Sequence, residues 1–297
     1  MTILAAIGKR LNETNQTIGI RELSDIEQDS LNCARCNIAL LENLVNSRYI
    51  LENNFQEFLN YAKYIKDSKD IITNNIGIQN CMTEIIHETN RLLINVLFAM
   101  TATVEHFKHH LKEMDREDYN TTVKNLFDSS PEYSFCYKLR NFSQHQCLPI
   151  TDMNISSSIY KEPDLNIYVN KGALLTYDSW GKIVRPYIES QDDKFEINNI
   201  IGKAISDLQE QVFLLWINKY VSNAENDIKI INDYVLEIMH YCLKNNFIDA
   251  HPCLLENILP LNETSTNLRI SISHFPLIFL NKIGVVKANY SLRDIEG

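Results

Sequence analysis

Six consecutive residues near the middle of the chain have side chains that suit the cleavage of RNA: Arg140-Asn141-Phe142-Ser143-Gln144-His145. RNA carries its own nucleophile, the 2′-hydroxyl group, so cleavage needs a group that titrates near neutral pH to move protons. It also needs a cation to offset the charge that develops on the phosphate. Histidine and arginine supply these functions, and the segment holds none of the acidic ligands of a metal site. The motif therefore favours metal-independent cleavage of RNA.

A single helix is predicted to carry this motif. Ser130 is a suitable N-cap, Pro131 fits the first helical position, and Leu148-Pro149 provides a stop, which together predict a helix over residues 131–147. Its core-facing side chains, at i, i+4 and i+7, are Phe135, Leu139 and Phe142.

The same helix separates the side chains of the motif. At about 100° per residue, Asn141 and His145 share one flank, whereas Arg140 points about 140° away from His145 around the axis. One helix alone would therefore not focus all three side chains on one phosphate.

Two long helices are predicted before the motif. Ser24 and Glu27 have the spacing of a capping box, so the first helix is expected to begin near Asp25. Apolar residues at helical spacing predict the second over residues 82–114, after a break at residues 74–77.

The pattern changes after the motif. Residues 165–169 and 173–177, joined by a glycine-containing loop at 170–172, predict a β-hairpin. Two further helices and a short strand or irregular cap are predicted over residues 195–221, 225–244 and 268–273. We expect residues 1–150 to form a helical bundle and residues 151–297 an extension that packs on the same bundle.

Composition limits the class of protein. The chain has 297 residues, 45% of them hydrophobic, which is enough for one large domain or two smaller ones. Its formal net charge of −10 argues against unselective coating of nucleic acid, which relies on many Lys and Arg contacts to phosphate. Seven cysteines, an odd number in a chain without a secretory leader, predict reduced thiols in the cytoplasm. No apolar run approaches the length that spans a bilayer, so no membrane partner is expected.

The motif resembles the pattern of the HEPN superfamily, in which arginine is followed by Asn or another polar residue, three variable residues and histidine. Two other segments look like HEPN-type proteins of bacterial defence and toxin systems: Asn90-Arg91-Leu92-Leu93-Ile94-Asn95 and Leu148-Pro149-Ile150. The resemblance covers about residues 25–150. It implies a mainly α-helical bundle, to which the hairpin and the C-terminal helices would be added.

The resemblance also implies roles for individual residues. His145 would act in proton transfer, Arg140 would bind or stabilise the scissile phosphate, and Asn141 would orient the histidine or the substrate. In HEPN proteins two copies of the motif commonly face each other across a dimer cleft, so an arginine of one subunit could complete the histidine of the other. The candidate substrate-binding residues are Gln144, Lys138, Glu105 and His109.

These expectations describe an endoribonuclease that needs no cofactor and acts as a homodimer, as a toxin or antiviral effector. A structured RNA such as tRNA is the expected substrate, because indiscriminate degradation suits an acidic protein poorly. Some HEPN toxins are silenced by modification of a tyrosine shortly after the histidine. Gln146 and Cys147 stand there in this chain, so any antitoxin would be a separate molecule that acts differently.

Other interpretations of these residues stay open. Arg140 and His145 could form a surface salt bridge or a cap, on a helical module that binds RNA or a protein without cleaving it. Glu105, His106, His109 and His110 could hold a metal ion, but a solvated polar face is the favoured prediction and no metal site is expected. Cys33 and Cys36 form a CxxC pair inside a predicted helix with no second pair, which predicts packing.

Overall fold

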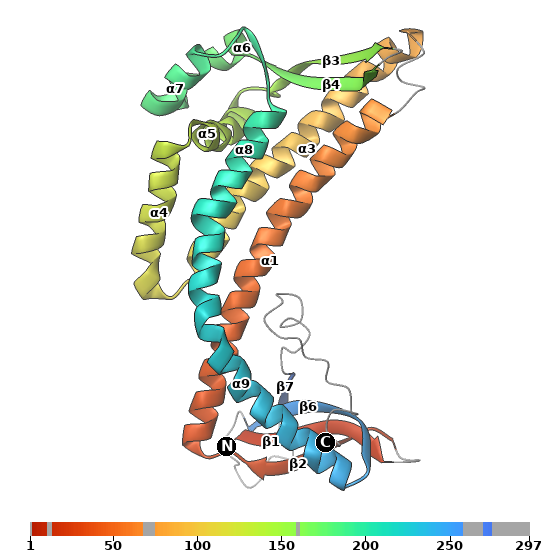
Figure 1. Cartoon of the computed structure of the whole chain (residues 1–297), viewed down its shortest axis with the longest axis vertical. Coiled ribbons are helices and arrows are strands. Elements are labelled where there is room, and N and C mark those ends of the chain that lie inside the picture. Colours follow the sequence, from red (N-terminus) through yellow and green to blue (C-terminus); the bar gives the residue numbers. More distant parts are fainter. Residues whose placement is uncertain (1, 11–13, 68–74, 159–160, 258–269, 275–297) are drawn as a thin grey trace. The chain divides into compact units, whose positions relative to one another are not determined.

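Helices make up most of the chain, and two small sheets accompany them (Figure 1). The computed structural model describes residues 2–10, 14–67, 75–158, 161–257 and 270–274. The mainly α-helical fold expected from the sequence is confirmed. The chain divides into two units, residues 1–42 with 218–297, and residues 43–217. The boundary expected at residue 150 therefore lies inside the second unit.

The first unit contains a four-stranded antiparallel sheet. Its strands lie in the order β2 (Gln16–Glu22), β1 (Thr2–Arg10), β6 (Phe247–Asn257) and β7 (Ile270–His274). The short strand predicted over residues 268–273 is confirmed for residues 270–273, which the structure describes. The strand β1 escaped prediction because Leu4, Ala5 and Ala6 are all fully buried, so the chain shows no alternation of apolar and polar residues there.

Helix α1 (Asp25–Asp67) begins in this unit, at the residue that the sequence predicts. The capping box forms, since the Ser24 backbone N–H donates to Glu27 Oε2 at 2.9 Å and the Glu27 N–H donates to Ser24 Oγ at 3.4 Å. Two orphan N–H groups at the start of the helix are thereby satisfied.

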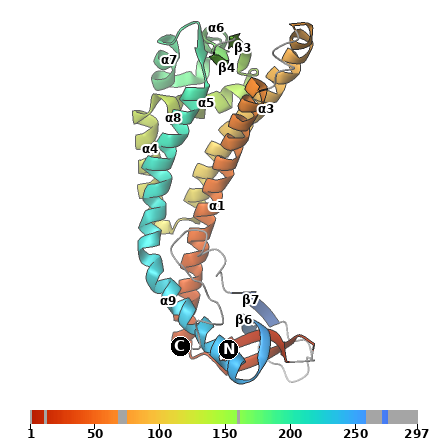
Figure 2. The same cartoon turned by 45° about the vertical axis from the view of Figure 1, so that its right-hand side comes forward.

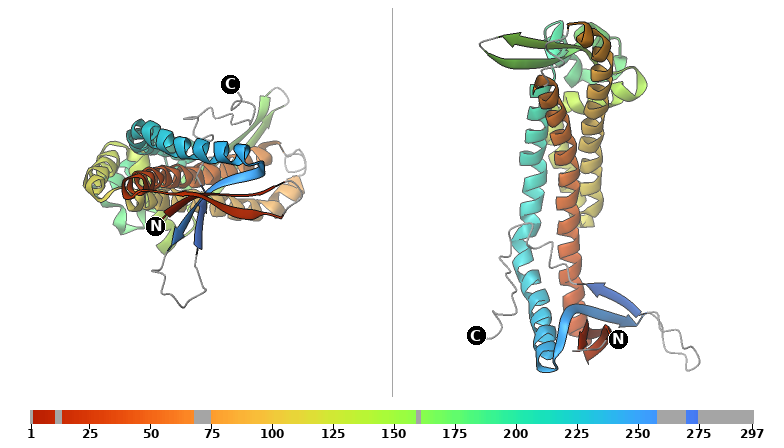
Figure 3. Two further views of the ribbon diagram at one scale, coloured as in Figure 1. Left: turned by 90° about the horizontal axis from the view of Figure 1, so that it is seen from below. Right: turned by 90° about the vertical axis from the view of Figure 1, so that its right-hand side faces the viewer.

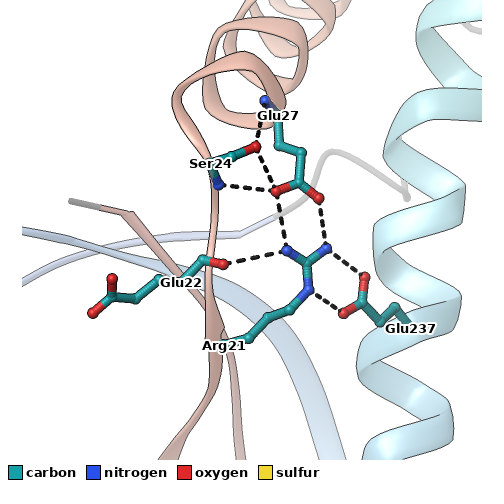
Figure 4. A network of polar contacts seen from close by, with 5 residues as sticks. All are labelled: Arg21, Glu22, Ser24, Glu27 and Glu237. Carbon is teal, nitrogen blue, oxygen red and sulfur yellow. Dashed lines mark hydrogen bonds and ion pairs between the residues drawn. The ribbon is translucent and has the colours of Figure 1, made fainter.

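Glu27 also belongs to an ion-pair network that joins three elements of the unit (Figure 4). The guanidinium of Arg21 on β2 donates to Glu27 on α1, at 2.9 and 3.1 Å, and to Glu237 on α9 (Leu214–Lys244), at 2.5 and 2.9 Å. Each carboxylate is therefore held by two hydrogen bonds from one planar cation.

The second unit is built around long helices, among them the part of α1 from residue 43, α3 (Asn75–His110) and α8 (Asn198–Leu208). These three run side by side (Figure 1, Figure 2). Thr103 Oγ1 of α3 donates to the Ser47 carbonyl oxygen of α1 at 3.2 Å. The end of α3 falls four residues before the predicted Met114, and the helix already includes residues 75–77, where the sequence predicts a break.

Shorter elements complete this unit. Helix α4 (Arg116–Ser129) follows the 3₁₀ turn η1 (Glu113–Asp115), and α5 (Pro131–His145) packs against α3, α4, α7 (Gly181–Glu189) and α8. The small elements between α5 and α8 are β3 (Ile150–Ser158), β4 (Lys161–Asn170), α6 (Lys171–Leu175), η2 (Asp178–Trp180) and β5 (Lys194–Glu196). The strands form an antiparallel sheet in the order β3-β4-β5.

The predicted hairpin is half wrong. Residues 165–169 do lie in β4, but the partner strand is β3, before them in the chain, and the β3–β4 hairpin extends from the helices of its unit (Figure 3, right). Residues 173–175 are helical, in α6. The cause is Asn170, whose Oδ1 accepts the N–H of Ala173 at 2.9 Å, so that this residue is an N-cap where the sequence predicts a turn.

For the two C-terminal helices predicted over 195–221 and 225–244, the end at Lys244 is confirmed, whereas the start at residue 195 and the break between them are wrong. Residues 194–196 form a strand, and the chain then continues from α8 through a π-helical segment (Gln209–Phe213) into α9, which is helical up to Lys244. The break predicted near residue 223 does not occur. Ala224 is buried there, so packing holds this stretch helical.

The CxxC pair does not pack in the core. Cys33 and Cys36 are both exposed on α1, and the prediction that they are packing residues is wrong. The buried positions of this turn are Leu31, Ala34 and Ile38, so the buried stripe runs past the two cysteines on another face of the helix.

Candidate functional site

Helix α5 is anchored at its N-terminus as the sequence predicts. Ser130 is the N-cap, with Oγ accepting the N–H of Tyr133 at 3.2 Å, and Pro131 occupies the first position. The Ser130 hydroxyl also donates to Asp207 Oδ2 at 2.8 Å, and Lys203 Nζ donates to Asp207 Oδ1 at 2.5 Å. The buried carboxylate of Asp207 thereby ties the start of α5 to α8.

The rotation of α5 about its axis is set by aromatic packing. Phe135, Leu139 and Phe142 are buried, as predicted. The rings of Phe135 and Phe142 both stack on Trp180, with centroid separations of 5.9 and 5.6 Å. Because these rings fix which side of the helix faces the core, they also decide which side chains of the motif are exposed.

Arg140 is half-buried and held on two sides. Its Cζ atom lies 4.8 Å from the centroid of the Phe98 ring of α3, and its Nη1 donates to Asn141 Oδ1 at 3.2 Å. Its Nε is buried without a hydrogen-bond partner. Nη2 makes no hydrogen bond to any described residue, so its N–H groups keep their donor capacity.

His145 is exposed at the last position of α5. It has no hydrogen bond or ion pair with any residue in the described ranges, and the structure brings Asn141 into contact with Arg140 instead. Within one chain Asn141 therefore orients the arginine. The structure joins Arg140 to Asn141 by a hydrogen bond, whereas His145 has no hydrogen bond to either of them.

The candidate substrate-binding residues fall into two groups. Lys138 and Gln144 lie on α5 and are half-exposed and exposed. Glu105 is exposed on α3. The pKa of Tyr133 is raised by burial, then by the charge of Tyr137 and then by that of Glu105, which indicates that Glu105 lies near Tyr133, at the other end of α5. Tyr133 lies 12 residues before His145, or about 18 Å along the helix. The structure therefore does not bring Glu105 to the motif, and His109 is one turn further along α3.

The sequence did not identify Asn90 as a residue that positions the chain next to the motif. Its side chain is fully buried, and its amide pairs with both backbone groups of Ile150: Oδ1 accepts the Ile150 N–H and Nδ2 donates to the Ile150 carbonyl, each at 2.9 Å. Nδ2 also donates to the Ile86 carbonyl at 2.9 Å. Asn90 thus fixes the chain five residues after His145. The only sequence signal was its place in the segment that resembles HEPN proteins.

The histidines at the end of α3 do not complete a metal centre. The described residues contain no group of three or more His, Cys, Asp and Glu side chains that could hold a metal ion. Burial, and then the charges of His109 and His106, lower the pKa of His110. None of the helices in the described part of the chain combines the length and apolar character needed to cross a lipid bilayer.

The chain matches no protein-family model, no curated protein sequence and no solved structure.

Proposed function

We propose that this chain is an endoribonuclease of HEPN type, with Arg140, Asn141 and His145 as its catalytic residues. The observation that carries the proposal is the arginine. Arg140 is held against Phe98 and Asn141 with part of its guanidinium free of hydrogen bonds to described residues, five residues before an exposed histidine on the same helix. A cation positioned in this way needs no rearrangement to stabilise charge on a phosphate.

The reaction needs only groups that RNA and these residues provide. The 2′-oxygen forms a bond to phosphorus as its proton leaves, and the bond from phosphorus to the 5′-oxygen breaks as that oxygen gains a proton. The products are a 2′,3′-cyclic phosphate and a 5′-hydroxyl. His145 would transfer a proton in one of these steps, and Arg140 would stabilise the charged phosphate.

We propose a homodimer, and the geometry of α5 supports it. Arg140 and His145 lie on different sides of one helix and do not meet within one chain, so a second copy would have to supply the missing partner. We propose a composite site between two copies, a structured RNA such as tRNA as substrate, and a role as a toxin or antiviral effector. A separate antitoxin would control it.

Incubation of the purified protein with tRNA in EDTA tests the proposal. We expect cleavage that survives chelation, yields cyclic phosphate ends, and fails on RNA with a 2′-O-methyl group at the cleaved position. His145→Ala and Arg140→Ala should each lower the rate at least about 100-fold, the scale of a lost acid–base or electrostatic contribution. Arg91→Ala is the control, because Arg91 is an exposed arginine already paired with Glu88 and Glu57.

Mixing the two inactive variants tests the composite site. If each dimer site takes arginine from one subunit and histidine from the other, a mixture of His145→Ala and Arg140→Ala subunits should regain part of the activity. A protein that binds RNA but leaves it intact under all conditions would instead be the non-catalytic helical module.

A further inference from the structure

Tyr137 is the one Tyr or Phe side chain of α5 that reaches the surface. Helix α5 carries four aromatic residues; three of them are buried, whereas Tyr137 is 37% exposed. It precedes Arg140 by three positions and Asn141 by four. Residues at these spacings are neighbours on a helix surface, so the Tyr137 ring lies one turn from the guanidinium.

The Tyr137 ring packs against two other aromatic rings. It contacts Phe127 of α4 edge to face, with centroids 5.6 Å apart and an interplanar angle of 87°, and Tyr133 at 6.4 Å. Phe127 is half-buried and Tyr133 buried, so the core side of the ring is occupied. A ring held in this way is ordered before any ligand arrives, which lowers the entropy lost on binding.

Arg140 is held in a similar manner, by Phe98. Two flat groups, a phenol and a guanidinium, therefore stand one turn apart on α5, each supported by a phenyl ring of a different helix. The positive charge at this surface comes from Arg140; Lys138 is half-exposed but points about 100° away from Tyr137 around the helix axis. The charge of Glu105 on α3 is among the causes that raise the pKa of Tyr133, which lies one turn before Tyr137.

RNA is recognised largely through unpaired bases, which stack on aromatic rings while cations bind the backbone. We propose that Tyr137 stacks on an unpaired base next to the phosphate held by Arg140, which makes the substrate an RNA with an unpaired nucleotide at the cleaved position. This inference rests on the proposed function, and it adds the substrate class. In a duplex the base is stacked and paired, so the ring has nothing to bind.

The test uses the full chain with His145→Ala, which prevents cleavage, and an RNA hairpin with 2-aminopurine in its loop. Stacking on Tyr137 should quench the fluorescence on binding. Tyr137→Leu should weaken binding about 5- to 100-fold, as expected for the loss of one stacked base, and abolish the quenching. Tyr137→Phe should retain both. A duplex of the same length should bind equally weakly to all variants.

Tyr64→Leu is the matched control, because Tyr64 is also exposed and stacked on a neighbouring ring, Tyr61, but on α1. Circular dichroism and thermal unfolding check that each variant is folded. Wild-type affinity in Tyr137→Leu would overturn the inference, even if wild-type protein cleaves RNA and the proposed function stands. If the His145→Ala protein binds no hairpin and the wild-type protein cleaves none, both proposals are wrong.

Discussion

Arg21 and Arg140 show how the surroundings of a guanidinium decide its use. Arg21 is paired with two carboxylates, Glu27 and Glu237, and its charge is fully compensated (Figure 4). Arg140 has a ring and a neutral amide as neighbours and forms no ion pair with any described residue. The first arginine therefore has a structural role, and the second is the better candidate for chemistry.

The Arg21 network predicts a dependence of stability on pH. Hydrogen bonds from Arg21 and then from Ser24 lower the pKa of Glu27 from its usual 4.5 to about 2. Because the pKa is lower in the folded state, the stabilisation is complete above pH 4.5 and is lost as the pH falls towards 2. Glu27→Gln should therefore lower the melting temperature at pH 7, and the difference from wild type should shrink between pH 4.5 and 2.

The control is Glu22→Gln, because the Glu22 carboxylate points away from Arg21 and only its backbone oxygen accepts a hydrogen bond (Figure 4). Added salt should reduce the effect of Glu27→Gln, since the side chains of Arg21 and Glu27 are 36% and 34% exposed. A difference that stays constant from pH 7 to pH 2 would contradict the assignment.

At the scale of elements, one buried amide connects α3 to the strand that follows α5. Asn90→Ala would remove the side-chain partner of both the N–H and the carbonyl of the buried residue Ile150. We expect a loss of about 2–4 kcal/mol in the free energy of unfolding of the second unit, measured by urea denaturation. Peptides covering residues 143–150 should also exchange amide hydrogens faster.

Asn54→Ala provides the comparison, because the Asn54 amide also donates to a carbonyl of its own helix, that of Ile50 at 2.8 Å, but at an exposed place and without a link to another element. It should change the free energy by less than about 0.5 kcal/mol. Equal effects of the two variants would show that the amide of Asn90 is not the connection.

At the scale of the whole molecule, the motif and the four-stranded sheet belong to different units. A substitution at Gly8 of β1 can test whether the units unfold separately. A Cβ there would clash within the first unit, at 2.8 Å from Phe247 Cε1 and 2.9 Å from the Ile248 carbonyl oxygen. Gly8→Ala should destabilise the first unit by about 1–3 kcal/mol. Hydrogen exchange should rise in β1 and β6, while α5 and RNA cleavage stay unchanged.

Gly202→Ala in α8 is the matched variant, since the nearest atom to its Cβ would be Phe55 Cζ at 3.9 Å. There alanine should stabilise the protein by up to about 1 kcal/mol, through helix propensity. Faster exchange in α5 of the Gly8→Ala protein would show instead that the two units unfold together.

Local signals in the sequence determined where helices α1 and α5 begin. The Ser24–Glu27 box and the Ser130-Pro131 start act within one turn, so they predicted the first residues of α1 and α5 correctly. The buried side of α5 was also predictable, because it follows from helical periodicity. The same reasoning predicted that Arg140 and His145 separate around the axis.

Contacts between residues far apart in sequence were decided only by the tertiary structure. The sequence could not show that Phe98 supports Arg140, that Phe127 supports Tyr137, or that Asn90 pairs with Ile150, since each contact depends on how two elements pack. The wrong hairpin has the same cause, because β4 pairs with β3 and leaves Asn170 to cap α6. The motif was therefore visible in the sequence, whereas the surroundings of Arg140, the Phe98 ring above all, arise from packing.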